Sequence, residues 1–430
     1  MIDRKTMFLL FLWLIPAALL GQESFKDTLR ITLSQSDSLF IESNLALLAE
    51  KCNVEASKAQ IIQARLFKNL TFEVNQNMLN TEYRTNGGRK WFDFTDKGET
   101  SMQIQKLFLV AGKRNKLIKL AESGAAKEEQ LYFDLIRTLK YTLHSQYYNI
   151  YFLQQILKVY DAEITSLKKL AQASEIESEK GFISKKELLR IRSMLFSLEN
   201  EKLGYYTQMI SAQTEFNTLM HSVNLFYYPL PDKKALELRI PKDLNLAALT
   251  DTALLYRYDL KMARTDLAIS DYNLSYQKAQ AVPDVTLSGG WDRNGSFIHN
   301  YNYVGLQVDL PFFDRNQGNI KAAKFSAEGF KYKLQGAEAQ VKADVINAFN
   351  TAMETEKLYS GFDTSFMKDV ENMNREMISN YEKRNISLVE FLDYYDAFKT
   401  NFIQINSLMN SRISAIEAIN YSVGKDIMSK

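Results

Sequence analysis

Two hydrophobic periodicities alternate along this chain of 430 residues. Apolar residues three or four positions apart, the spacing of one helical face, recur over residues 33–67, 113–177, 246–282 and 314–381. Apolar residues two positions apart, the spacing of a half-buried strand, recur over residues 70–79, 101–109, 284–292 and 302–310. The pattern predicts the order helix, strand, strand, long helix and shorter helix, and it predicts that order twice.

Each predicted strand has one apolar and one polar side. In the third strand, polar positions alternate with Val285, Leu287 and Trp291. The second strand is the least regular, because Lys106 falls on its apolar side. Glycine-containing turns, at residues 86–88 and near Gly295, are predicted to join the strands of each pair.

The predicted helices are unusually long, and residues 113–177 alone would form a rod of roughly 100 Å at about 1.5 Å per residue. The stretch 33–67 presents one apolar face, made of Leu39, Leu45, Leu48, Cys52, Ala56, Ala59, Ile62 and Leu66. After residue 187 a heptad seam follows, with Lys202 as its charged interruption. The local structure predicted there is an antiparallel helical hairpin.

An eleven-residue motif marks the end of each long helix. The pattern E-K-x-x-I-S-x-x-E-[LF]-L occurs at Glu179–Leu189 and again about 203 residues later at Glu382–Leu392. Each copy closes one helical stretch and opens the next, and we name it the elbow. Because the order of elements and the elbow repeat together, the chain is predicted to be an internal duplication.

The duplication predicts the domain boundaries. The first repeat covers residues 22–220, with its elbow at about 172–187, and the second covers residues 246–430, with its elbow at about 379–390. Residues 221–245 hold three of the six prolines and form the predicted linker.

Residues 1–21 have the form of a secretory signal peptide. A basic start at Arg4 and Lys5 precedes an almost unbroken apolar run, and Gly21 offers a small residue for cleavage. A membrane-anchoring helix is the alternative, but about 14 apolar residues are too few to span a bilayer. The chain is therefore predicted to be exported and to begin at about Gln22, without a lipidated cysteine.

Composition and dispersed histidines argue against several classes of function. The net charge of +2 gives no electrostatic basis for binding nucleic acid. A single cysteine excludes an internal disulfide, and the three histidines, His144, His221 and His299, have no metal-ligand spacing. No nucleophile motif or phosphate-binding loop occurs. The sequence therefore predicts no enzymatic activity, no metal site and no cofactor.

Four alternating strands raise a problem of closure. Their length and pattern match strands of a transmembrane barrel, but four strands cannot close one and an open edge is not tolerated in lipid. Two copies of the chain would supply eight strands and three copies would supply twelve. Only the larger barrel leaves an aqueous lumen, which the long helices would extend.

At this point the chain resembles the TolC-like outer membrane efflux proteins. The resemblance rests on the exported start, the duplicated element order, the elbows, the segment Ala279–Pro283 before the third strand and the segment Leu310–Asp314 after the fourth. It implies a mainly α fold with a small β part. The expected assembly is a homotrimer with a twelve-stranded barrel in the outer membrane and a twelve-helix barrel in the periplasm of a Gram-negative bacterium.

The resemblance also implies a function. It is that of a passive, gated exit duct for a tripartite efflux or type I secretion system. The expected partners are outer membrane lipid, a periplasmic adaptor protein and an inner-membrane pump of the RND or ABC type. The alternative is an exported coiled-coil scaffold or adhesin with no channel. Cargo and pump type stay open.

In this family an acidic pair after the second elbow narrows the periplasmic entrance. The matching residues are Glu390 and Asp393, which are spaced to share one helical face, and the first repeat has Glu187 and Arg190 at these positions. An ion pair from Arg190 to Asp393 of another subunit would hold the closed state, whereas the alternative is that all four residues only solvate helix surfaces. The elbow residues expected to contact the adaptor are Gly181, Ile183, Ser184, Asn385, Ile386 and Ser387.

Overall fold

The computed structural model describes residues 27–76, 99–223, 225–238, 240, 244–293, 298–361, 376–377, 379–381 and 383–428. The predicted signal peptide, the turns at residues 86–88 and Gly295, and part of the helical stretch 314–381 lie outside these residues.

The chain forms two compact units, each built from both sequence repeats. The helical unit comprises Met1–Ala49, Phe133–Arg257 and Gln340–Lys430, and the sheet unit comprises Glu50–Tyr132 and Tyr258–Ala339. The compact units are defined by which residues contact one another, whereas the repeats are defined by similarity along the sequence. The units therefore do not test the repeat boundaries, which stay a prediction.

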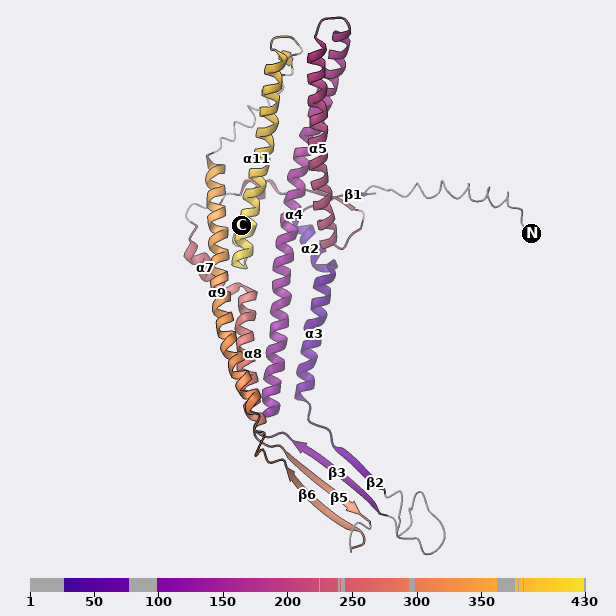
Figure 1. The fold of residues 1–430 in the computed structure, drawn as a ribbon, viewed down its shortest axis with the longest axis vertical. Helices are drawn as coiled ribbons and strands as arrows, with labels where there is room; N and C mark the ends of the chain where they lie inside the picture. The colour runs from indigo at the N-terminus through magenta and orange to yellow at the C-terminus, as the bar shows by residue number, and fades with distance from the viewer. Residues whose placement is uncertain are drawn as a thin grey trace, which may run out of the picture. The chain divides into compact units, whose positions relative to one another are not determined.

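The sheet unit contains a four-stranded antiparallel sheet in the order β2-β3-β5-β6 (Figure 1). Its strands are β2 (Thr71–Gln76), β3 (Thr100–Phe108), β5 (Val285–Asp292) and β6 (Tyr301–Val308). The outer strands β2 and β6 each pair on one side only among the described residues. The two strands of the first repeat therefore lie beside the two strands of the second.

The register of the strands places the apolar side chains on one face. Phe72 is level with Ile104 of β3, which is level with Gly289, which in turn is level with Val304 of β6. Val304 is 89% exposed, so no described residue covers this apolar face at β6. Lys106 belongs to the same face, and its amine lies 5.6 Å from the centre of the Phe108 ring, which accommodates the charge.

The opposite face of the sheet is polar. Gln103 of β3 is level with Glu73 of β2 and with Gly290 of β5. A Cβ at Gly290 would lie 2.5 Å from the Tyr303 ring, so glycine is what lets that ring lie against the strand.

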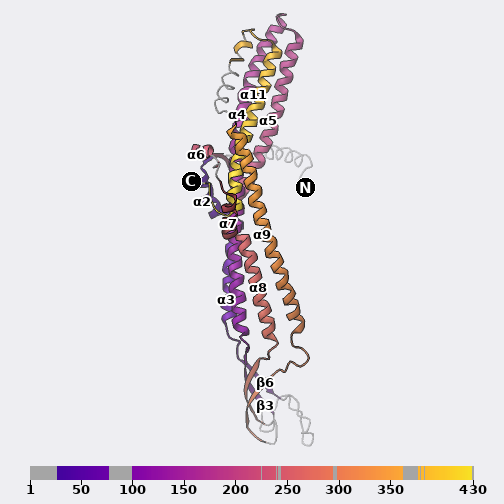
Figure 2. The same ribbon diagram turned by 90° about the vertical axis from the view of Figure 1, so that its left-hand side faces the viewer.

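Four helical segments form a layer in the sheet unit: α3 (Leu45–Arg65), the start of α4 (Lys113–Glu179), α8 (Tyr258–Gln280) and the first part of α9 (Gln317–Ser360). Ion pairs connect them in sequence, from Arg65 to Glu122 at 2.8 Å, from Lys127 to Asp266 at 2.6 Å and from Arg264 to Glu338 at 3.9 Å. The helix order α3, α4, α8, α9 thus matches the strand order (Figures 1 and 2).

Two of the predicted helices are each interrupted once. The stretch 33–67 divides into α2 (Leu33–Ser43) and α3, because Asn44 is extended and its side-chain amide donates to the Leu219 carbonyl over 2.9 Å. The stretch 246–282 divides into α7 (Leu246–Tyr256) and α8 at Arg257, whose guanidinium pairs with Asp344 at 2.7 Å. In both places the helix is interrupted at a residue whose side chain binds a group that is distant in the sequence.

Most of the apolar face predicted on residues 33–67 is exposed where it lies on α3. Leu48 and Ile62 are exposed, and Cys52 and Ala59 are exposed with them. The side of α3 that is buried in the sheet unit instead carries Val54. Periodicity identified an apolar face correctly but did not show whether its partner lies in the same chain.

The helical unit is built around α4, α5 (Lys185–Leu219) and α11 (Leu388–Val423) (Figure 1). Their buried residues form one cluster that includes Tyr160, Ile191, Leu198 and Phe391. Lys202, the charged interruption of the predicted seam, pairs with Asp161 across the α4–α5 hairpin. Among the described residues, no helix has the length and apolar character needed to cross a membrane.

The predicted linker contains ordered structure. Within it, β4 (Leu225–Pro229) pairs in parallel with β1 (Asp27–Ile31), and α6 (Lys233–Glu237) follows. The side-chain amide of Gln213 donates to the Tyr227 carbonyl over 2.7 Å and its carbonyl accepts from the Tyr227 amide. These bonds fasten β4 to α5.

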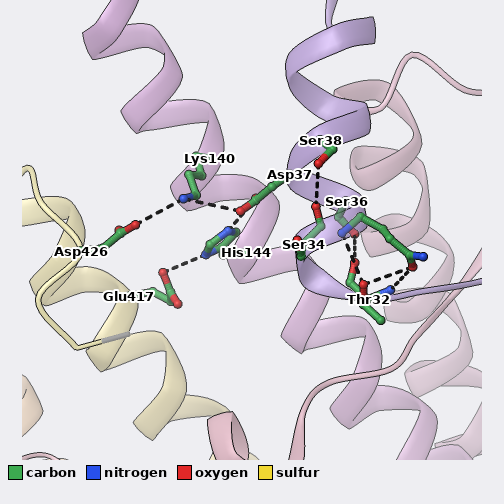
Figure 3. A network of polar contacts seen from close by, with 10 residues as sticks. Thr32, Ser34, Ser36, Asp37, Ser38, Lys140, His144, Glu417 and Asp426 are labelled. Atoms are coloured by element: carbon green, nitrogen blue, oxygen red, sulfur yellow. Dashed lines mark hydrogen bonds and ion pairs between the residues drawn. The ribbon is translucent and has the colours of Figure 1, made fainter. Parts of the chain in front are cut away.

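A buried histidine joins three distant segments of the helical unit (Figure 3). Nε2 of His144 lies 2.8 Å from Oδ1 of Asp37 in α2, and Nδ1 lies 3.0 Å from Oε2 of Glu417 in α11. Lys140, one turn earlier on α4, lies 3.5 Å from both Asp37 and Asp426. Because both ring nitrogens face carboxylates, both must donate, and the imidazole is positively charged.

The carboxylates control the protonation of this histidine. Burial alone would lower the pKa of His144, but hydrogen bonds to Asp37 and Glu417, together with their charges, raise it to about 9. Burial likewise would raise the pKa of Asp37, but His144 and Lys140 hold it below its usual value. The charged network therefore persists at neutral pH and fastens α2, α11 and the C-terminal segment to α4.

We expect His144→Gln to destabilise the protein by on the order of 3 kcal/mol at pH 6, since one unit of pKa shift corresponds to about 1.4 kcal/mol. Because the pKa is raised on folding, the contribution of His144 is complete below pH 6.5 and is lost as the pH rises through about 9. Melting temperatures of the two proteins should therefore converge above pH 9. The exposed His221, replaced by Asn, is the control, and a constant gap from pH 6 to pH 10 would contradict the assignment.

Candidate functional site at the helical elbows

The first elbow ends α4 with a left-handed residue. Gly181 has a φ of 81°, and its amide donates to the Ser178 carbonyl over 3.1 Å. The Phe182 amide donates to the Glu177 carbonyl over 2.9 Å. These two bonds satisfy carbonyl groups at the helix end, and glycine adopts the required backbone conformation without steric cost.

The second elbow repeats this geometry with a different residue. Arg384 occupies the left-handed position with a φ of 63°, and the Asn385 amide donates to the Asn380 carbonyl over 2.8 Å. A non-glycine residue in this region costs on the order of 1 kcal/mol. The Arg384 guanidinium lies 2.9 Å from the carboxylate of Glu177, so it also joins the second elbow to the first. Glu382 of the motif lies outside the described residues.

Both elbows start the next helix with the same capping arrangement. The Ser184 hydroxyl accepts from the Glu187 amide over 3.2 Å, and the Glu187 carboxylate accepts from the Ser184 amide over 3.1 Å. Ser387 and Glu390 do the same at the start of α11, at 3.2 Å and 2.8 Å. The repeated I-S-x-x-E therefore encodes a capping box, which satisfies two of the free amides at a helix start.

The four predicted gate residues thus divide into two pairs. Glu187 and Glu390 hold the caps, and the hydrogen bonds from the Ser387 amide and hydroxyl lower the pKa of Glu390 below its usual value. Arg190 and Asp393, one turn further along their helices, are exposed and make no ion pair within the described part of the chain. Arg190 and Asp393 are therefore the pair without a role in capping, although the carboxylate of Glu390 is exposed as well.

The predicted adaptor-contacting residues include several that shape the elbows. Gly181, Ser184 and Ser387 form the turn and the caps, and Ile386 packs against the helical core. The sequence interpretation missed two exposed apolar side chains, Phe182 and Val389. Phe182 lies in the turn of the first elbow and Val389 lies in the first turn of α11. Exposed apolar side chains close to a turn can indicate an interaction surface.

Aromatic side chains of the adjoining helices pack next to the second elbow. The ring of Tyr381 stacks on Phe391 with centroids 4.8 Å apart, and Phe391 also contacts Tyr395. Lys399 lies 3.0 Å from the carboxylate of Glu201, to which the Tyr160 hydroxyl also donates. The described residues contain no group of side chains able to hold a metal ion.

Comparison with known proteins gives related sequences. The model of the family described as outer membrane efflux protein matches residues 249–357. The cobalt-zinc-cadmium resistance protein CzcC of Cupriavidus metallidurans is 22% identical over 300 residues, covering 68% of this chain. The match spans 66% of the relative's own length, slightly less than two thirds.

Solved structures give the fold. The CmeC outer membrane channel of Campylobacter jejuni aligns with a TM-score of 0.72 and 14% identity, covering 93% of this chain and 87% of CmeC. The open-state MtrE outer membrane channel of Neisseria gonorrhoeae aligns with a TM-score of 0.72 and 16% identity, covering 92% of this chain and 89% of MtrE. These matches confirm the predicted fold class. The chain is accordingly similar to the outer membrane efflux protein family over residues 249–357, and it has the TolC-like fold that its sequence predicts.

Proposed function

We propose that this chain is the outer membrane exit duct of a tripartite efflux or type I secretion system. It lies in the outer membrane and extends into the periplasm, where its elbows form the entrance. Its role is passive, gated conduction, with no chemistry of its own. The match of residues 249–357 to the outer membrane efflux protein family supports this role.

The observation that carries the proposal is the open four-stranded sheet with an uncovered apolar face. The outer strands β2 and β6 have unsatisfied backbone groups that hydrocarbon would not tolerate. Pairing β6 of one copy with β2 of the next continues the antiparallel alternation and closes the sheet without a new fold. Three copies would give twelve strands and an aqueous lumen, which is why we propose a homotrimer.

The elbows are proposed to be the gate and the adaptor-binding surface. Arg190 and Asp393 are exposed and unpaired within the described chain, at equivalent positions after the two elbows. An ion pair between Arg190 of one copy and Asp393 of the next would narrow the entrance. Phe182 and Val389 add exposed apolar contacts for a periplasmic adaptor, which would link the duct to an inner-membrane pump of the RND or ABC type.

Cargo selection is proposed to lie with the pump. The printed name of the relative CzcC concerns cobalt, zinc and cadmium. Divalent cations are therefore the first cargo class to test, by deleting the gene and measuring resistance to these three ions.

We expect the purified protein in detergent to be a trimer and to give discrete single-channel currents in planar bilayers. Light scattering measures the mass and bilayer recording measures the conductance. A monomer that produces no currents would contradict the duct.

We expect Arg190→Asp and Asp393→Arg each to raise single-channel conductance, because each places like charges across the proposed contact. The double variant Arg190→Asp with Asp393→Arg restores opposite charges and should return the conductance towards the original value. Single variants with unchanged conductance would remove this pair from the gate. Failure of the double variant to restore the conductance would do the same.

We expect Glu390→Gln with Asp393→Asn to reduce the preference of the channel for cations. The reason is that the substitutions remove both negative charges of the acidic pair at the proposed entrance. Glutamine can still complete the capping box, so the helix start is preserved. Reversal potentials in a salt gradient measure the selectivity. Glu354→Gln with Glu328→Gln, on the exposed surface of α9, is the matched control.

A further inference from the structure

Positive charge gathers where the sheet meets the helices of the first repeat. There β2 follows α3, and β3 leads into α4 (Figure 1). Four basic residues lie at this junction, and we name them the basic cluster. They are Lys68 between α3 and β2, Lys106 near the end of β3, and Arg114 and Lys116 in the first turn of α4. None of the four forms an ion pair within the described part of the chain.

The carboxylates next to this junction are engaged with other cations. Glu122 pairs with Arg65 at 2.8 Å. Asp284 pairs with Lys113 at 2.9 Å and also accepts a hydrogen bond from the Val110 amide. The basic cluster therefore carries four positive charges for which the described residues supply no counter-charge.

Two of these cations approach the same aromatic ring. The guanidinium carbon of Arg114 lies 3.9 Å from the centre of the Phe67 ring, and the Lys106 amine lies 5.9 Å from that centre. The Arg114 guanidinium also donates to the Arg65 carbonyl, which holds it in place. Like charges brought together repel each other, and an anion between them removes the repulsion. Phe67 is 70% exposed, so the ring lies open to a ligand.

The second repeat builds the same junction without these charges. A shift of about 204 residues aligns β3 with β6, and it aligns the start of α4 at Lys113 with the start of α9 at Gln317. The residue before each helix is left-handed, with a φ of 66° at Gly112 and 57° at Asn316. The shift aligns Lys106, Arg114 and Lys116 with three uncharged residues, which are Leu310, Gly318 and Ile320.

The fold therefore does not explain the basic cluster. The strand-to-helix connection forms in the second repeat without cations at the aligned positions. Cations are also unfavourable in the first turn of a helix, and the first turn of α4 contains no acidic residue to offset them. An anionic ligand is the remaining physical reason for the cluster.

An apolar surface begins beside the basic cluster. Phe67 and Leu70 are exposed, and the apolar face of the sheet continues from them with the exposed side chains of Phe72 and Ile104. Lys106 lies on this same face of β3, two residues after Ile104. A ligand that fits both surfaces is anionic at one end and long and apolar at the other.

We infer that the basic cluster binds the phosphate of an anionic glycerophospholipid, whose acyl chains lie along the apolar face of the sheet. Arg114 has N–H donors left besides those bonded to Arg65, and Lys106 extends its amine from an apolar surface towards a headgroup. A zwitterionic lipid fits less well, because its own cation already neutralises its phosphate. The inference rests on the proposed duct, which places this junction at the periplasmic surface of the outer membrane.

Lipid binding by the full chain in detergent tests the inference. The immobilised protein is equilibrated with mixed micelles of detergent and one lipid, and the bound lipid is extracted and quantified across a titration. Phosphatidylglycerol should bind at least tenfold more tightly than phosphatidylcholine, which has the same phosphate but no net charge. An excess of inorganic phosphate should leave most of the phosphatidylglycerol bound.

Two double variants locate the site. Lys68→Gln with Lys106→Gln should weaken phosphatidylglycerol binding at least tenfold and leave phosphatidylcholine binding unchanged. Neither lysine donates a hydrogen bond within the described chain, so the melting temperature should not change. Lys321→Gln with Lys324→Gln removes two exposed lysines from α9 in the same unit and is the matched control. It should leave the binding of both lipids unchanged.

Four outcomes would overturn this lipid site. They are equal binding of the two lipids, an equal loss in the control variant, full displacement of the lipid by inorganic phosphate, and dissociation of the trimer in Lys68→Gln with Lys106→Gln. The last would assign the cluster to carboxylates of a neighbouring copy. Any of these results in a protein that conducts as a trimer leaves the duct intact. A non-conducting monomer would overturn the duct itself.

Discussion

The arrangement of this protein depends on backbone hydrogen bonds that its own described residues do not complete. The outward-facing N–H and C=O groups of β2 and β6 have no partner in the four-stranded sheet. Buried peptide groups are almost always paired, and in hydrocarbon water cannot substitute for the missing partner. An apolar sheet face with two such edges is stable in a membrane only when further strands close it. The proposal that other copies of the chain complete the sheet follows from this one constraint.

The edge helices of the sheet unit are also incomplete, but in their side-chain packing and not in their backbone hydrogen bonds. Helices satisfy their own backbone groups, so an edge helix is open in its side chains rather than in its amides. Both α3 and α9 carry apolar faces roughly opposite the ones that they bury within the chain. A helix in a closed ring has two neighbours and needs two such faces, whereas a helix at the edge of a monomeric bundle needs one.

The hydrophobic periodicity of the sequence predicted those features that depend on neighbouring residues. The long helix was predicted over residues 113–177 and α4 runs from Lys113 to Glu179, because helical periodicity is a property of neighbouring residues. The break at Asn44 was not predicted, because its cause is a hydrogen bond to Leu219, which is distant in sequence. The parallel pairing of β1 with β4 was missed for the same reason.

The candidate site shows a similar division. The elbow motif was recognised, but its glutamates were interpreted as gate residues or as solvated surface residues, although S-x-x-E is also the signal of a capping box. The structure assigns Glu187 and Glu390 to caps and leaves Arg190 and Asp393 exposed. The network at His144 could not be foreseen, since Asp37 and Glu417 approach it from opposite ends of the sequence. Composition and spacing identify the chemistry of single residues, whereas only the fold shows which residues meet.

The replacement of Gly181 by Arg384 at the equivalent turn has a consequence for stoichiometry. Duplication makes the two elbows alike in their capping boxes, but the side chain at this turn makes them distinguishable. In a threefold assembly, a ligand that recognised only the shared caps would find six equivalent docking points. A ligand that required the arginine would find three. The copy number of whatever docks on this end is thus determined by which of the two features it contacts.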